Sequence, residues 1–67
     1  MSARLLLERA SALGSGRATF LLAETYDERE LSRLRVQGLR GDPEQARQLY
    51  LRAYAAGIPE ALERAQR

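Results

Sequence analysis

The chain lacks several residue types on which protein chemistry most often depends. Its 67 residues include no cysteine, histidine, lysine, tryptophan or asparagine. Without cysteine there is no disulfide framework, thiolate metal site or cysteine nucleophile. Without histidine the usual general base and the commonest metal ligand are missing, and without lysine there is no Schiff-base or P-loop lysine. We therefore expect no enzyme activity, no cofactor and no metal site.

The charge is close to balanced and of mixed sign along the chain. Eleven arginines and nine carboxylates give a net charge of +2. A net charge this small produces only a weak electrostatic field. Nucleic-acid-binding proteins normally have their positive charge gathered on one face. The apolar run Leu5–Leu7 near the N-terminus is followed at once by Glu8 and is too short for a signal peptide or a membrane span. The sequence therefore predicts a cytoplasmic protein without a membrane segment.

The composition predicts an all-α fold. Leucine and alanine make up a third of the residues, whereas isoleucine and valine occur once each. Leucine, alanine, arginine and glutamate are good helix formers, and the β-branched residues that favour strands are nearly absent. About four main helices and one short inserted helix are expected.

Start and stop signals place these helices along the chain. Ser2 and Ser15 are suited to begin helices over 2–14 and 16–26, which the turn Gly14-Ser15-Gly16 joins into a hairpin. Asp27 and Glu30 have the spacing of a capping box and begin the short helix. A loop over 37–42, a helix from Asp42-Pro43 to Gly57 and a last helix over 58–67 follow.

Three of the helices carry apolar stripes at helical spacing, which predicts that these faces are buried. The stripe of the first helix comprises Ala3, Leu6, Leu7, Ala10 and Leu13. On the second helix the stripe comprises Ala18, Leu21, Leu22 and Tyr26 (or Thr25), and Phe20 and Glu24 lie together off that face. The stripe of the helix after Asp42 comprises Ala46, Leu49, Tyr50 and Ala53. On the last helix, Glu60 and Arg64 are spaced for an ion pair one turn apart.

The chain partly repeats itself at an offset of 43 residues. Residues 1–24 and 44–67, aligned without gaps, give eight identities in 24 pairs. The identical pairs are Ala3–Ala46, Arg4–Arg47, Leu6–Leu49, Arg9–Arg52, Ala10–Ala53, Ala12–Ala55, Gly14–Gly57 and Ala18–Ala61. Each copy holds a helix, a glycine turn and the start of a second helix. Such a period predicts a helical solenoid.

Two segments resemble a known repeat. Residues 18–26 read Ala-x3-Leu-Ala-x2-Tyr, and residues 42–61 read Asp-x3-Ala-x2-Leu-Tyr-x2-Ala-x2-Ala-Gly-x3-Ala. This pattern resembles the Sel-one-like repeat, a relative of the tetratricopeptide repeat, with Ala23 where glycine is usual and Leu49 where tryptophan is usual. The stretch from Tyr26 to Gly38 is longer than in the family, which implies an insertion near 27–40.

The resemblance implies a segment of stacked antiparallel helix pairs. Residues 2–14 would be the second helix of one repeat, 16–57 a complete repeat and 58–67 the first helix of another. The structural repeat positions would be Ala10, Gly14, Ala18, Leu22, Tyr26, Gly38, Asp42, Ala46, Leu49, Tyr50, Ala53, Gly57 and Ala61. Both terminal helices would then present apolar faces without a neighbour. We expect either a fragment of a longer array or a homo-oligomer that associates through the terminal helices.

The resemblance also implies a protein-binding scaffold or adaptor that accepts a peptide or helix of its partner. In arrays of this type the first helix of each pair lines the concave groove, which makes Arg17, Phe20 and Glu24 candidate partner-binding residues. Tyr54 is a fourth candidate, although Phe20 and Tyr54 have the alternative of packing in the core. Tyr50 is expected in the core.

Two other functions are compatible with the sequence. A small arginine-rich nucleic-acid binder would use the basic stretch Arg29, Arg33, Arg35 and Arg40, although nearby carboxylates favour an ordinary solvated surface there. A purely structural, oligomerising segment would have no ligand of its own. The arginine, alanine and leucine content suggests a bacterial source.

Overall fold

A computed structural model describes residues 3–67, in which 71% of the residues are helical and none forms a strand. The all-α prediction is therefore confirmed, with five helices: α1 (Ala3–Ala12), α2 (Gly16–Tyr26), α3 (Glu28–Arg33), α4 (Pro43–Ala55) and α5 (Glu60–Ala65). The predicted cap at Ser2 lies outside the described residues.

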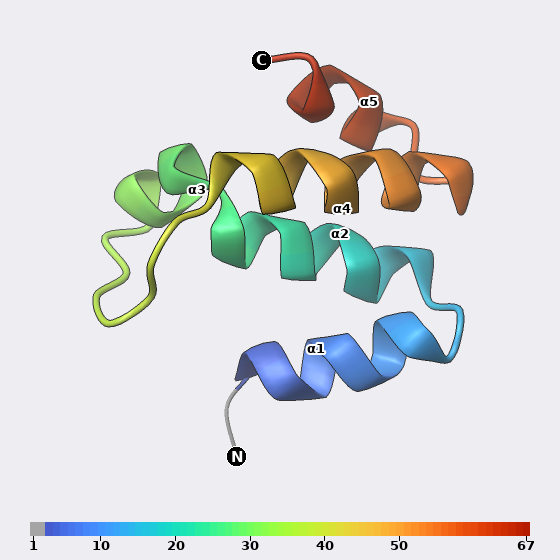
Figure 1. The fold of residues 1–67 in the computed structure, drawn as a ribbon, viewed down its shortest axis with the longest axis horizontal. Helices are drawn as coiled ribbons and strands as arrows, with labels where there is room; N and C mark the ends of the chain where they lie inside the picture. The colour runs from blue at the N-terminus through green and yellow to red at the C-terminus, as the bar shows by residue number, and fades with distance from the viewer. Residues whose placement is uncertain (1–2) are drawn as a thin grey trace.

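Four of the helices lie in a row in the order α1, α2, α4, α5, with neighbours antiparallel (Figure 1). Helix α3 and the loop that follows it lie to one side of this row, beside the end of α2 and the start of α4. The Cα atoms span 29 × 29 × 17 Å, the dimensions of a flat slab. Helix α4 therefore packs between α2 and α5, whereas α1 packs mainly on α2.

Side-chain caps begin α2, α3 and α4 at the residues where the sequence predicts helix starts. Ser15 accepts a hydrogen bond from the Ala18 amide (3.1 Å) and Asp42 accepts one from the Gln45 amide (3.2 Å). These oxygens satisfy amides that have no partner inside the helix.

The capping box predicted at the start of α3 is only half formed. Asp27 accepts from the Arg29 amide (3.0 Å), but Glu30 does not return to the Asp27 amide. Helix α2 runs directly into α3, so that the Asp27 amide already donates to the Glu24 carbonyl (3.2 Å). The Glu30 carboxylate is thus left for other partners.

Glycines end α1 and α4 at positions that are equivalent in the 43-residue repeat. Gly14 has φ of 97° and Gly57 has φ of 101°. For a residue with a side chain, this left-handed backbone conformation is unfavourable by about 1 to 2 kcal/mol of free energy. The chain therefore leaves both helices by the same kind of turn.

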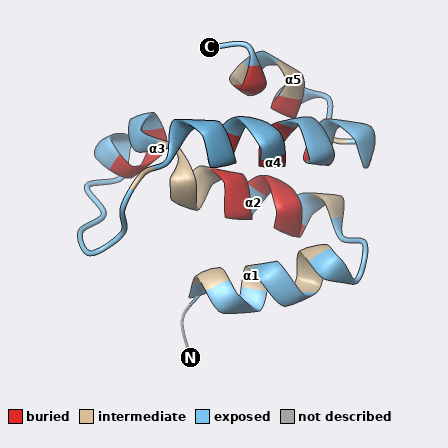
Figure 2. Cartoon of the chain, viewed as in Figure 1, coloured by how far each residue is buried: buried red, intermediate tan, exposed pale blue. Residues whose placement is uncertain are grey.

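The core is built from α2, α4 and α5, and Figure 2 shows no buried residue on α1. Its buried members are Phe20, Leu22, Ala23, Ala46, Leu49, Tyr50, Ala53, Ala61 and Ala65. The rings of Phe20 and Tyr50 meet at a centroid distance of 5.6 Å and an angle of 59°. Leu22, Leu49 and five alanines make up the rest of the core, and small residues such as alanine let packed helices approach closely.

The stripe predicted for the first helix is not buried as expected. The residues that meet α2 are Arg4, Leu7 and Ser11, because Arg4 and Ser11 contact Thr25 and Thr19 and Leu7 packs on the core. Leu6 and Leu13 are 53% and 89% exposed. The prediction was wrong for these leucines because α1 has α2 on one side and no helix on the other.

A buried charge at Ala53 should unfold the protein. Ala53 is completely buried between helices, so Ala53→Arg removes a guanidinium from water without a partner and costs more than about 4 kcal/mol. Circular dichroism should show loss of the cooperative thermal transition. The control Leu51→Arg, at a half-exposed position of the same helix, should keep it. A native-like transition in Ala53→Arg would show that the packing register is wrong.

Candidate interaction surface

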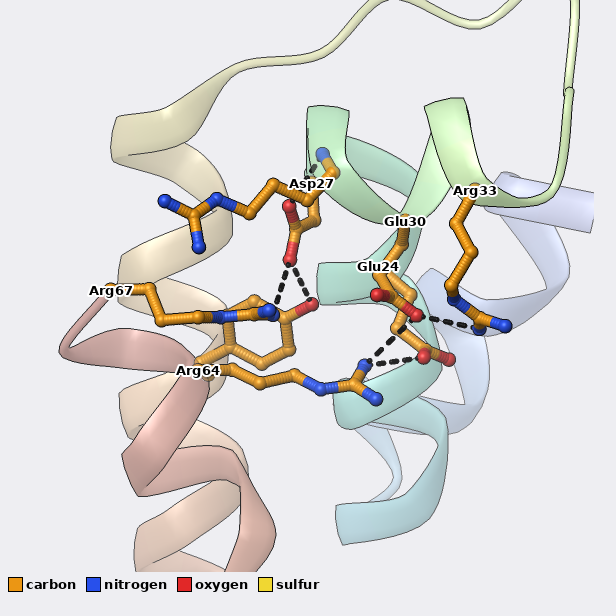
Figure 3. Close-up of polar contacts among 8 residues, drawn as sticks. Glu24, Asp27, Glu30, Arg33, Arg64 and Arg67 are labelled. Carbon is orange, nitrogen blue, oxygen red and sulfur yellow. Dashed lines mark hydrogen bonds and ion pairs between the residues drawn. The ribbon is translucent and has the colours of Figure 1, made fainter.

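An arginine of the last helix holds three helices together. Arg64 of α5 bonds the Glu24 carboxylate of α2 (2.5 Å) and lies 3.5 Å from the Glu30 carboxylate of α3. Figure 3 shows its guanidinium between the two carboxylates, with Arg33 on the other side of Glu30 at 2.9 Å. Two cations thus share two acids in a half-buried network.

The same guanidinium covers the aromatic core. Arg64 lies 4.8 Å from the centre of the Phe20 ring and 5.9 Å from that of Tyr50. A cation over an aromatic face is attracted by the negative charge of the ring, more strongly when water is excluded. Arg64 therefore joins the apolar core to the acidic side chains of α2 and α3.

Glu30 is a buried acid that stays ionised. Its hydrogen bond to Arg33 lowers the pKa of the carboxyl below 4.5, and the Arg64 charge adds to this against the opposing effect of burial. For Arg64, burial lowers the pKa, but the bonds to Glu24 and other acceptors raise it overall. A fully ionised acid held by fixed cations stabilises structure and is poorly suited to donate protons at neutral pH.

Tyr50 connects α4 to the junction of α2 and α3. Its hydroxyl donates to the Asp27 carboxylate (2.7 Å), which also receives Arg67 at 3.4 Å. Burial raises the pKa of Tyr50, and the bond to Asp27 raises it further. The phenol therefore stays protonated and serves as a structural donor.

A cleft of about 380 Å³ opens beside this network, between α4, α5 and the start of α3. Asp27, Arg29, Arg47, Tyr50, Arg64 and Arg67 are among the residues that line it. Arg47, Arg64 and Arg67 are already paired with carboxylates of the chain. Three of the four arginines that line the cleft are therefore neutralised by carboxylates of the chain itself, which makes it poorly suited as an anion site.

The four predicted partner-binding residues occupy different environments. Arg17 is exposed on α2, with its guanidinium 5.9 Å from the Phe20 ring centre. Phe20 is buried against Tyr50, so its ring is not open to a partner as the groove prediction required. Glu24 is engaged by Arg64, and Tyr54 is 45% exposed on α4.

Sequence reasoning missed Arg64 and Glu30. The spacing of Glu60 and Arg64 predicted a pair within α5, but Arg64 pairs with Glu24, 40 positions away. Arg64 turns to the core because two acids and two aromatic rings lie on that side. No short-range pattern signals such a contact.

The basic stretch does not act as one uniform patch. Arg33 pairs with Glu30, whereas Arg29 lines the cleft and Arg35 lies in the exposed segment after α3. The Arg40 carbonyl accepts a bond from Arg4 of α1 (3.3 Å). These side chains therefore face different surroundings.

An apolar face of α1, continued by Leu13 just past its end, is left uncovered. We define the α1 stripe as Ala3, Leu6, Ala10 and Leu13, of which only Ala10 is partly buried. The repeat-equivalent residues of α4 include Ala46, Leu49 and Ala53, which are 4%, 4% and 0% exposed. The first three stripe positions thus carry the same residues in both copies and are packed on α4, whereas Ala56, the equivalent of Leu13, is exposed.

Comparison of the chain with protein-family models, curated proteins and solved structures gives no match. Within residues 3–67, no helix is long and apolar enough to cross a membrane. The same residues contain no cluster of three acidic, histidine or cysteine side chains suited to hold a metal ion.

Removing the Glu30 charge should weaken the protein in a pH-dependent way. Folding lowers the pKa of Glu30, so the ionised carboxylate stabilises the folded state. This stabilisation is complete above about pH 4.5 and is lost as the pH falls through the pKa of Glu30 in the folded protein. Glu30→Gln should reduce the free energy of unfolding at neutral pH by about 1 to 2 kcal/mol. Urea denaturation should show this difference disappearing in acid.

The control for this measurement is Glu63→Gln, which removes an exposed carboxylate from α5. It should change the stability little at any pH. An equal loss in both variants would mean that net charge, rather than the Arg64 network, sets the effect.

Proposed function

We propose that this chain is a protein–protein interaction module, a helical scaffold that binds another polypeptide through an exposed helix face. The observation that carries the proposal is the α1 stripe, where Leu6 and Leu13 are 53% and 89% exposed. Apolar residues gathered on one open face are characteristic of interaction sites, whereas single exposed ones are ordinary.

We further propose that the scaffold belongs to the Sel-one-like or tetratricopeptide type, with α2 and α4 as its complete helix pair. The row of antiparallel helices supports this arrangement. The repeat-equivalent glycines share a left-handed conformation, and Ala18 and Ala61 are both buried. A stack of this kind buries each helix only when both of its neighbours are present.

Binding suits this surface better than catalysis. The carboxylates that the fold gathers, Glu24 and Glu30, are held by Arg64 and Arg33. The phenol of Tyr50 is held by Asp27. These polar groups already bind partners within the chain and hold the helices in place. The exposed face of α1 therefore binds a partner through apolar contacts.

Nucleic-acid binding has less support, because Arg33, Arg47, Arg64 and Arg67 are each within 4 Å of a carboxylate. A nucleic-acid complex would weaken steeply with salt as phosphate contacts release counterions. An apolar helix face would bind with little salt dependence.

Photocrosslinking tests the proposed function in the cells that produce the protein. A benzophenone amino acid is placed at Leu6 or Leu13, and at Leu34 as a control, since Leu34 is 55% exposed on another helix end. We expect protein adducts from positions 6 and 13 that position 34 does not give. Identical adducts at all three positions would contradict a specific α1 face.

A further inference from the structure

We infer that the α1 stripe is the contact surface for a second copy of this chain, with two α1 helices packed antiparallel about a twofold axis. This inference rests on the proposed function, since it names the partner of the same face.

The stripe has the spacing of a helix-pairing seam. Its members follow one another by three, four and three residues, the pattern that keeps side chains on a narrow face in paired helices. It is a different face from that of Arg4, Leu7 and Ser11, which meet α2. A second helix can therefore lie along α1 without displacing α2.

The sizes along the stripe are self-complementary. Small and large residues alternate as Ala3, Leu6, Ala10 and Leu13. Residues 3 and 13, and likewise 6 and 10, are equally distant from Glu8. When two copies run antiparallel about an axis at Glu8, each leucine faces an alanine of the other copy. A twofold contact requires one surface to match itself in this way.

Charges do not oppose this arrangement. Glu8, which lies at the axis in sequence, is on the opposite side of the helix and lines a hollow with Gln45, Gln48 and Arg52. The two Glu8 carboxylates are therefore not brought together. Arg9 lies beside the stripe and is exposed, so its long side chain can stay in water.

The other terminal helix is less suited to receive the stripe. Helix α5 turns Ala61 and Ala65 into the core and leaves Glu60 and Glu63 exposed along the helix, with Gln66 and Arg67 exposed beyond its C-terminal end. Packing Leu6 and Leu13 on that surface would cover charged groups and offer only the partly buried Leu62 as an apolar partner. This asymmetry favours α1 against α1 over a head-to-tail stack.

The contact is small, because α1 has ten residues. Interfaces of this size form weak or transient dimers. We expect a concentration-dependent monomer–dimer equilibrium in sedimentation velocity experiments. Leu6→Glu/Leu13→Glu should raise the dissociation constant by about tenfold or more, while the control Leu34→Glu should leave it unchanged. Both variants should keep the wild-type thermal transition.

Cysteine pairing tests the register directly, because the natural chain has no cysteine. A mixture of Leu6→Cys and Ala10→Cys chains should form a mixed disulfide under mild oxidation, and each variant alone should form much less of its own. Predominant disulfides between identical variants would overturn the antiparallel register. A dimer that survives Leu6→Glu/Leu13→Glu would overturn the choice of face.

The outcome also separates this inference from the proposed function. A chain that stays monomeric at the highest soluble concentration would overturn the second-copy proposal. The protein-binding function would still stand if benzophenone at Leu6 captured a different protein. Absence of any adduct at positions 6 and 13 would remove the proposed function itself.

Discussion

The close approach of helix backbones at alanine is the contact on which the rest of this structure depends. Ala23 of α2, Ala53 of α4 and Ala61 of α5 are completely buried. A chain of 67 residues buries little apolar surface and has no disulfide to compensate. Small residues at the crossings bring the axes close enough for two aromatic rings, Phe20 and Tyr50, to fill the remaining space.

The polar network depends on that packing and strengthens it. Once α5 lies on α4, Arg64 is placed over the two rings and within reach of Glu24 and Glu30. Removing either partner would leave a charge in a half-buried place. Glu24 and Glu30 thus connect α2 and α3 to α5.

The two copies of the internal repeat show how neighbours decide what a helix face does. Leu6 and Leu49 are equivalent in sequence, yet one is half-exposed and the other is 4% exposed. The difference lies in the surroundings, because α4 is packed on two sides and α1 on one. A leucine at equivalent positions of the repeat thus lies in the core on α4 and on an open surface on α1.

The sequence by itself determined which segments are helical and where α2, α3 and α4 begin, whereas the last helix, predicted over 58–67, spans only Glu60–Ala65. Strong helix formers, the caps at Ser15, Asp27 and Asp42 and the turns at glycine act within a few residues, so a linear pattern contains them. The tertiary structure alone decided the rest: the exposure of the α1 stripe, the burial of Phe20 and the partners of Arg64. These depend on contacts between segments up to 40 positions apart, and no local spacing records which segments meet.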